Sequence, residues 1–367
     1  MLDLSNFPSG TRIQTAEQVR MGHPDRLADM IADGLLLFCV NNYPYDLSFL
    51  RCAFEVMLNG DNVFVCGETN FPNLETRDVK SVVGSVLGKY TPLAPFPKVN
   101  VSIQKQSSQL QKASSLGAGD QGVVYGYCDS VFHHQPMAFN IANYACELLD
   151  IHSNIEYLMP DGKVQVYFLN GVDAHLIVSA QQSEEARTNV RKWAFEEQVS
   201  HYLSTMIEKK FSINVKTVHL SNNPQFIKGG AAADTGLTGR KIHCDAYGSG
   251  NYHGGGAFAG KDLTKVDRSG AYYAALLANA ICRNTGEKTA VQLTYCLGEK
   301  NPISCAYKLG DDSRGFVLFD DSDDILAVGD LVDNLSSIVY NEKFLFPDYR
   351  YSHIDLLVSG FPKGAFV

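Results

Sequence analysis

Strand-like and helix-like segments alternate along the whole chain, and this alternation constrains the fold more than any other feature of the sequence. Short runs with a period of two precede longer runs with apolar residues at helical spacing, and the succession recurs about three times, at roughly 110–120 residues each. A chain of 367 residues is also longer than one hydrophobic core usually serves. The sequence therefore predicts the α+β class with several domains, and it suggests a three-fold internal architecture.

The clearest predicted helix begins at His23-Pro24-Asp25 and ends at Asn41-Asn42-Tyr43-Pro44. Proline suits the first helical turn, and apolar residues recur at helical spacing between these ends. Further helices are predicted over residues 70–90, 138–149, 183–209 and 269–283, and strands over 99–104, 123–128, 163–169 and 174–180. The polar stretch 106–119 lacks apolar periodicity, so we predict a loop there that could close as a lid.

Two strand-like segments, 51–58 and 62–68, flank Asn59-Gly60, which is the strongest short signal for a hairpin. A two-residue turn at that point pairs Leu58 with Asp61. Alternation along the strands then places four side chains on one face, namely Arg51, Glu55, Phe64 and Glu68. The charged members fit either solvated cross-strand pairs or part of a functional site.

Charge and composition argue against several classes of protein. The formal net charge of −9 argues against a general nucleic-acid binder, because neutralising phosphates requires a basic excess. The longest apolar runs are too short to cross a bilayer, and the first residues show no secretory signal. The nine cysteines include no Cys-x-x-Cys pair, which favours reduced thiols in a cytoplasmic protein over disulfides or a zinc site.

Two glycine motifs fit the patterns of nucleotide-binding loops but lie in the wrong context. Residues 117–122 fit the dinucleotide pattern, yet a polar stretch precedes them and a strand-like segment follows, whereas a Rossmann site needs strand, turn and helix in that order. Residues 255–261 have P-loop spacing, but no apolar strand leads into them, and Asp262 stands where Ser or Thr is required. A mobile surface loop is the alternative for this second motif, although its backbone N–H groups and lysine can still bind an anion.

Basic and acidic residues gather in and after the glycine-rich segment 229–260. They are Arg240, Lys241, Lys261, Lys265 and Arg268, interleaved with Asp234, Asp245, Asp262 and Asp267. Cations beside glycine backbone suit a polyphosphate, and aspartates suit its Mg²⁺ ions. Residues 22–26, Gly-His-Pro-Asp-Arg, offer similar groups at a helix N-terminus. Taken singly, these motifs predict only that an anion is bound together with a metal.

Taken together and in order, the motifs resemble the signatures of the S-adenosylmethionine synthetase family. The likeness rests on residues 22–25, 117–122, 236–241 and 253–258, on Lys261-Asp262 and on residues 265–269. It implies three similar α/β-sandwich domains in a pseudo-three-fold arrangement, which we place at 1–110, 111–228 and 229–367. It also implies a methionine adenosyltransferase, in which methionine sulfur attacks the 5′ carbon of ATP and releases triphosphate that is then hydrolysed to phosphate and diphosphate.

The resemblance also implies roles for individual residues. The nucleotide would be bound by His23, Asp161, Lys163, Phe226, Asp234, Arg240, Lys241, Ala257 and Lys261. Five of these would act as catalytic residues on the triphosphate, namely His23, Lys163, Arg240, Lys241 and Lys261. L-Methionine would be bound by Glu68, Gln106, Asp234 and Lys265. Two Mg²⁺ ions would be held by Asp25 and Asp267, and K⁺ by Glu55.

The family's active site lies between two subunits, so the resemblance implies a homodimer or homotetramer, with ATP and methionine as its small-molecule partners. We expect no nucleic-acid partner and no membrane association. The sequence departs from the family most in the predicted lid, which is shorter and reads Ser-Ser-Gln-Leu after Gln106. Two other functions therefore stay open: a catalytically weak regulatory subunit of the same family, and an ATP-dependent phosphotransferase that uses residues 255–261.

Overall fold

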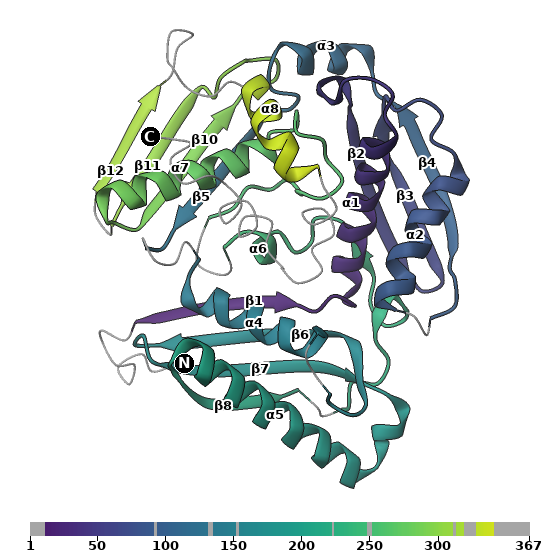
Figure 1. Cartoon of the computed structure of the whole chain (residues 1–367), viewed down its shortest axis with the longest axis vertical. Coiled ribbons are helices and arrows are strands. Elements are labelled where there is room, and N and C mark those ends of the chain that lie inside the picture. The colour runs from purple at the N-terminus through teal and green to yellow at the C-terminus, as the bar shows by residue number, and fades with distance from the viewer. Residues whose placement is uncertain are drawn as a thin grey trace, which may run out of the picture.

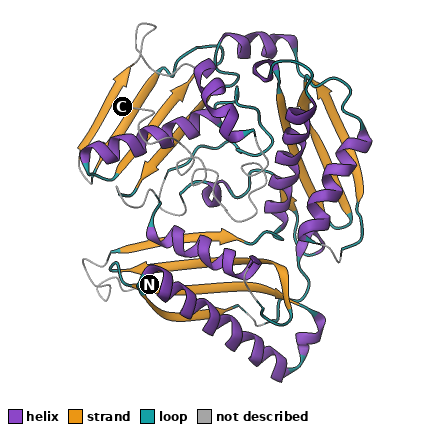
Figure 2. Ribbon diagram, viewed as in Figure 1, coloured by secondary structure: helices purple, strands orange, loops and turns teal. Residues whose placement is uncertain are grey.

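The computed structural model describes residues 12–91, 94–130, 135–151, 154–221, 224–247, 252–310, 313–318 and 328–340. These residues form three four-stranded sheets, each associated with a pair of helices (Figures 1 and 2). The predicted α+β class and the repetition of similar α/β units are confirmed. The domain boundaries at residues 110 and 228 stay a prediction.

The N-terminal sheet has the strand order β4-β3-β2-β9 and packs against α1 and α2. Its elements are α1 (Pro24–Asn42), β2 (Cys52–Asn59), β3 (Asn62–Thr69), α2 (Thr76–Tyr90), β4 (Lys98–Lys105) and β9 (Gly236–Leu237). The hairpin strands β2 and β3 are antiparallel, and β4 returns parallel to β3 after the crossover through α2.

The central sheet repeats this plan with the order β1-β6-β7-β8 and the helices α4 and α5. Its elements are β1 (Ile13–Val19), α4 (Met137–Ile151), β6 (Leu158–Leu169), β7 (Asp173–Gln182), α5 (Asn189–Phe211) and β8 (Asn214–Leu220). Strands β6 and β7 form the antiparallel hairpin, and β8 returns parallel to β7 after α5.

The C-terminal sheet has the order β12-β11-β10-β5 and departs from this plan. Its elements are β5 (Gly122–Cys128), α7 (Ser269–Thr285), β10 (Thr289–Tyr295), β11 (Ser304–Leu309), β12 (Ser313–Leu318) and α8 (Val328–Val339). Here β12 follows β11 directly and pairs with it antiparallel.

Each sheet takes one edge strand from another part of the chain. Strand β1 precedes α1 but pairs with β6, β5 precedes α4 but pairs with β10, and β9 precedes α7 but pairs with β2. Figure 1 shows the purple β1 lying beside the teal β6, far along the chain. The three units are therefore interleaved in a cycle, which ties each sheet to its neighbours through the backbone.

Three sequence-based predictions were wrong: the register of the hairpin, the loop at 106–119 and the placement of Arg51. The hairpin turn closes at the pair Asn59–Asn62, so the register is shifted by two residues from the predicted Leu58–Asp61 pair. Because the shift is even, Glu55 and Glu68 still share a face. The predicted lid loop is in fact a helix, α3 (Ser108–Leu116), which begins where the Ser107 hydroxyl accepts a hydrogen bond from Leu110 N.

Helix α3 is fixed to the N-terminal sheet through Arg51, whose side chain was predicted to lie on the strand face. Arg51 is buried instead, and its Nε donates to Oγ of Ser114 at 2.8 Å. A polar stretch can therefore form a helix, because its cap and this anchor replace the apolar stripe that the sequence lacks.

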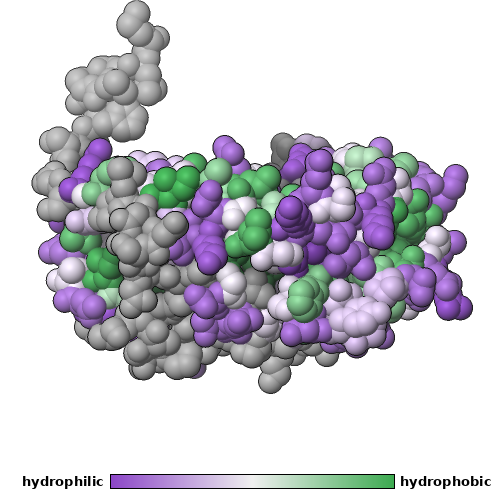
Figure 3. Space-filling view, turned by 90° about the horizontal axis from the view of Figure 1, so that it is seen from above, coloured by the Kyte–Doolittle hydropathy of each residue, from purple (hydrophilic) through white to green (hydrophobic). Residues whose placement is uncertain are grey.

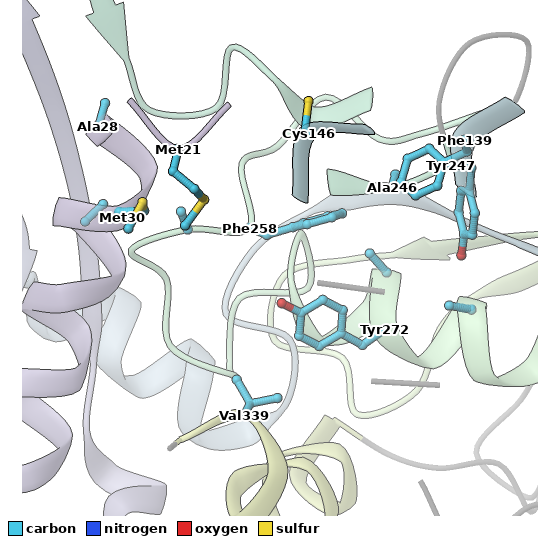
Figure 4. Packing of buried hydrophobic residues seen from close by; sticks show 14 of the residues in the cluster. Met21, Ala28, Met30, Phe139, Cys146, Ala246, Tyr247, Phe258, Tyr272 and Val339 are labelled. Atoms are coloured by element: carbon cyan, nitrogen blue, oxygen red, sulfur yellow. The ribbon is translucent and has the colours of Figure 1, made fainter. Parts of the chain in front are cut away.

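The hydrophobic core extends from the helices into the glycine-rich segment. Figure 4 shows Met30 of α1, Tyr272 of α7 and Phe258 in one cluster of buried residues. The rings of Phe258 and Tyr272 meet edge to face, with centroids 5.7 Å apart. This aromatic contact packs the glycine-rich segment against α7, although glycine by itself favours a flexible backbone.

The surface seen from above carries hydrophobic residues in small groups among hydrophilic ones (Figure 3). Within the parts of the chain that the structure describes, no helix has both the length and the apolar character needed to cross a membrane.

Candidate active site

A cavity of ≈ 400 Å³ opens between the N-terminus of α1 and the strands β6 and β7. Five residues that were predicted to bind the nucleotide line it, namely His23, Asp161, Lys163, Phe226 and Asp234. They come from four separate parts of the sequence, so the fold brings them together. The cavity is also lined by residues that no sequence motif had indicated, among them Gln165, Ile177, Ser179 and Ser221.

His23 caps α1, and its hydrogen bonding fixes which ring nitrogen carries the proton. Its Nδ1 accepts a hydrogen bond from Asp25 N at 3.2 Å, so the neutral ring carries its proton on Nε2. Burial lowers the pKa of His23 to about 4, and the charges of Lys241 and Lys163 add to the effect. The imidazole is therefore a neutral hydrogen-bond donor near pH 7. Gly22 before it is pressed against Pro160, where a Cβ would lie 2.4 Å from the Pro160 Cβ.

Asp25 is only 1% exposed, and both of its oxygens have partners. Lys241 Nζ lies 2.7 Å from Oδ2, while Leu237 N donates to Oδ1 at 2.9 Å and Arg240 lies 3.6 Å from that oxygen. Burial alone would raise the pKa of Asp25, but the hydrogen bonds from Lys241 and Leu237 outweigh it, so the pKa is lowered. The structure thus places three predicted site residues in one ionic cluster.

Asp161 and Lys163 lie two residues apart on β6, and both line this cavity. Oδ2 of Asp161 accepts a hydrogen bond from Gly230 N at 2.7 Å, and burial raises the pKa of this carboxyl. Lys163 Nζ forms an ion pair with Glu17 of β1 at 3.0 Å. Glu17 was not among the predicted site residues.

A second group forms on the N-terminal sheet around Glu68. Gln106 Nε2 donates to Oε1 of Glu68 at 3.1 Å, and Lys265 Nζ lies 3.8 Å from the same oxygen. Gln106 is 2% exposed, and its Oε1 has no hydrogen-bond partner among the described residues. A buried acceptor without a partner costs free energy unless a ligand supplies a donor.

Lys261 and Asp267 form an ion pair, in which Nζ of Lys261 and Oδ2 of Asp267 are 2.5 Å apart. The backbone of Gly256 passes so close to Asp267 that a Cβ there would lie 2.0 Å from the carboxyl carbon. Ala257 follows and lies against Gly239, the residue before Arg240. The glycine-rich segment therefore lies against both the Lys261–Asp267 ion pair and the backbone next to Arg240.

Glu55 is exposed on the open face of β2. Its cross-strand partner is Cys66, and Glu68 is its diagonal neighbour on the same face. The prediction that Glu55 and Glu68 share a strand face is confirmed, even though the predicted register was wrong.

Helix α1 carries three acids at positions i, i+4 and i+8, and each accepts a backbone N–H from the glycine-rich segment. Asp25 accepts from Leu237 at 2.9 Å, Asp29 from Gly239 and Asp33 from Gly260, both at 2.8 Å. Sequence reasoning missed Asp29 and Asp33, although acids at helical spacing on an otherwise apolar helix were a visible signal.

The predicted site residues thus fall into two sets. We call His23, Asp25, Asp161, Lys163, Phe226, Asp234, Arg240 and Lys241 the nucleotide group, and Glu68, Gln106, Lys261, Lys265 and Asp267 the methionine group. The methionine group thus also contains Lys261, predicted to bind the triphosphate, and Asp267, predicted to bind Mg²⁺, whereas Glu55 and Ala257 belong to neither group. Within the described parts of the chain, no hydrogen bond or ion pair joins a side chain of one group to a side chain of the other.

Comparisons with known proteins find one family. Residues 11–108 match the S-adenosylmethionine synthetase N-terminal domain, and residues 228–320 match the C-terminal domain of the same family. Proteins named S-adenosylmethionine synthase are similar along most of the chain. The protein from Borrelia garinii subsp. bavariensis is 35% identical over 320 residues, 79% of each chain. That from Thermus thermophilus is 34% identical over 80% of each chain, and that from Sulfurovum sp. is 32% identical over 95% of this chain and 94% of its own. The chain belongs to the S-adenosylmethionine synthetase family.

Proposed function

We propose that this chain makes S-adenosylmethionine from ATP and L-methionine and hydrolyses the released triphosphate to phosphate and diphosphate. The observation that supports the methionine half is the unpartnered Oε1 of Gln106 beside the carboxylate of Glu68. The ammonium group of an amino acid offers donors to both oxygens, and Lys265 offers a cation to its carboxylate. This group therefore complements an amino acid by charge.

The nucleotide group supports the ATP half of the proposal. Phe226 offers an aromatic face for adenine, and Asp161 and Asp234 lie in the same cavity to accept hydrogen bonds from the nucleoside. The hydrogen-bond donors proposed for the triphosphate are His23 Nε2 and the side chains of Lys163, Arg240, Lys241 and Lys261. The backbone of Ala257 is proposed to contact it as well. The cavity is large enough for a nucleoside, which is a small ligand.

The reaction needs no general base, because the thioether sulfur of methionine is already a neutral nucleophile. The difficult parts are alignment of sulfur behind the 5′ carbon and stabilisation of the departing triphosphate. Alignment of bound reactants can lower a barrier by up to about 7–11 kcal/mol. One preorganised donor to the developing charge contributes on the order of 3 kcal/mol. A site rich in cations and poor in nucleophilic side chains suits this chemistry.

Two Mg²⁺ ions are part of the proposal, and the residues fit them. Asp25 and Asp267 offer carboxylate oxygens, which Mg²⁺ prefers, and each now pairs with a lysine that is proposed to bind phosphate. When bound, Mg²⁺ would neutralise charge on the triphosphate. Lys241 and Lys261 would then exchange their aspartates for phosphate oxygens. Glu55, with its exposed carboxylate, is proposed to bind K⁺.

A homodimer or a higher assembly of the same chain is proposed to join the two groups. Met57 pairs across the N-terminal sheet with Phe64 on one side and Leu237 on the other, so three apolar residues form a row on its open face. Phe64 and Leu237 are each 38% exposed, and a second copy would bury them. All nine cysteines are free thiols, which supports a reducing compartment such as the cytoplasm.

One assay tests the proposed function. The purified protein is incubated with ATP, L-methionine, Mg²⁺ and K⁺, and the products are separated by chromatography. The proposal expects S-adenosylmethionine together with phosphate and diphosphate, and no product when methionine is omitted. Release of ADP would instead support a phosphotransferase. Absence of turnover, with retained binding of ATP, would support a regulatory subunit.

A further inference from the structure

A cluster of three different metal-ligating side chains lies beside the nucleotide group. It consists of Glu17 on β1 and of His243 and Cys244 on the short helix α6 (Ile242–Asp245). One donor atom from each residue lies within 4.8 Å of the other two. Figure 1 shows α6 in the middle of the molecule, and the two elements are in contact. The proposed synthesis of S-adenosylmethionine uses none of these three side chains directly.

The spacing of the donor atoms suits a tetrahedral ion. His243 Nε2 lies 3.4 Å from Oε1 of Glu17 and 3.4 Å from Sγ of Cys244. Ligands bound to zinc at its usual bond lengths of about 2.0–2.3 Å are separated by about 3.3–3.6 Å when the angles are tetrahedral. Both separations fall within this range, and the third pair of donor atoms, on Glu17 and Cys244, lies within 4.8 Å.

The ligand types select the class of metal. The thiol of Cys244 donates to the backbone oxygen of Glu17 at 3.3 Å, and binding of the ion would release this proton to solvent. The resulting thiolate and the imidazole favour Zn²⁺ or a similar borderline ion, whereas Mg²⁺ prefers oxygen ligands and would not compete well here. His243 and Glu17 are partly exposed, at 31% and 17% of their side chains, and Cys244 is buried. Solvent can therefore reach the cluster from the imidazole side, where a water would complete four ligands.

We propose that Glu17, His243 and Cys244 bind one divalent ion of the zinc class, separate from the Mg²⁺ ions of the proposed reaction. Oε1 of Glu17 also pairs with Lys163 at 3.0 Å, and Oε2 accepts a hydrogen bond from Gln165 at 2.8 Å. The ion therefore competes with Lys163 for Oε1. Binding of the ion frees the ammonium group of Lys163, which lines the nucleotide cavity.

The test uses Co²⁺ alone, because a thiolate bound to cobalt gives a charge-transfer absorption band that oxygen and nitrogen ligands do not give. The full-length protein is titrated with Co²⁺ in the absence of nucleotide. We expect a saturable band with one Co²⁺ per chain, lost in Cys244→Ser and weakened at least about tenfold in affinity in His243→Gln. Cys66→Ser is the matched control, because Cys66 is an exposed thiol outside the cluster, and its band is expected to match that of the wild type.

A second variant tests the competition with Lys163. Lys163→Met removes the ammonium group that shares Oε1 of Glu17, so Co²⁺ is expected to bind about twofold to fivefold more tightly, the range for loss of one partly exposed ion pair. A wild-type protein without a saturable band would overturn the proposal, as would a band that survives in Cys244→Ser or disappears in Cys66→Ser. An unchanged affinity of Lys163→Met for Co²⁺ would show that the ion does not compete with Lys163 for Oε1 of Glu17. None of these readouts depends on synthesis of S-adenosylmethionine.

Discussion

Asp25 illustrates how the single residues of the site depend on one another. The carboxylate is buried, so its charge is stable only because Lys241 and the N–H of Leu237 contact it directly. Arg240 approaches the same carboxylate from 3.6 Å, but its side chain is 47% exposed. Solvent screens an exposed cation strongly, so the two basic neighbours contribute unequally to stability.

This inequality gives the first prediction. Lys241→Met leaves a buried carboxylate without its main partner, which is expected to lower the free energy of unfolding by about 3 kcal/mol. Arg240→Met removes only the screened neighbour and is expected to cost less than about 1 kcal/mol. Urea unfolding of both variants at pH 7 measures the difference. Equal losses would show that Lys241 has no special role at Asp25.

His23 gives a prediction for the effect of pH. Its pKa is lowered from 6.5 to about 4 in the folded chain, because burial and the nearby lysines disfavour the charged ring. As pH falls from 6.5 towards 4, the unfolded chain takes up a proton and the folded chain does not, so stability is lost through this window. His23→Gln removes this contribution. The wild type is expected to lose about 3 kcal/mol more than the variant between pH 7 and pH 4 in urea unfolding. Parallel curves for the two proteins would contradict the account.

At the scale of elements, α1 organises the site. Its three acids hold the glycine-rich segment at Leu237, Gly239 and Gly260, so the helix sets the positions of Arg240, Lys241 and Lys261 through the backbone. Asp29 is the middle acid and is 3% exposed, and its Oδ2 has no hydrogen-bond partner among the described residues. Burial, with the charge of Asp245, raises the pKa of Asp29 well above its usual value.

The Asp29 carboxyl can therefore be replaced by a neutral group at little cost. Asp29→Asn keeps an oxygen that can accept from Gly239 N and is expected to change the free energy of unfolding by less than about 1 kcal/mol. Asp29→Ala leaves that N–H without a partner and is expected to cost about 2–3 kcal/mol and to lower kcat through the displaced Arg240. Urea unfolding and steady-state kinetics measure both. A loss in the Asn variant as large as that in the Ala variant would show that the charge itself is needed, because only the Asn variant keeps an acceptor for Gly239 N.

Elements with a strong periodic signal could be predicted from the sequence, and those fixed by distant contacts could not. The bounds of α1 were predicted because its proline start and apolar spacing are local. Helix α3 was missed because Arg51, about sixty residues earlier, holds it in place. Strand β9 has only two residues and exists because Met57 and Leu58 lie opposite it. The hairpin register also depended on turn geometry that Asn59-Gly60 did not specify.

At the scale of the whole molecule, the interleaving of the sheets explains why the parts of the site were easier to predict than their grouping. Motif residues could be named one by one from the resemblance, but the cyclic exchange of β1, β5 and β9 has no local signal. Asp161 and Lys163 of the nucleotide group lie on the central sheet, whereas Glu68 of the methionine group lies on the N-terminal sheet. The proposed reaction needs both groups around one pair of substrates, and we propose that a second copy of the chain supplies one of them.

Complementation between two inactive variants tests this account most directly. Lys163→Met disables the nucleotide group and Glu68→Gln disables the methionine group, so each variant alone is expected to make little S-adenosylmethionine. The two chains are co-expressed with different affinity tags, and the heterodimer is purified and supplied with ATP and L-methionine. If each site takes its two groups from different chains, one of the two sites is intact, and the heterodimer is expected to make S-adenosylmethionine at about half the wild-type rate. A heterodimer no more active than the single variants, beside an active wild type, would contradict a shared site.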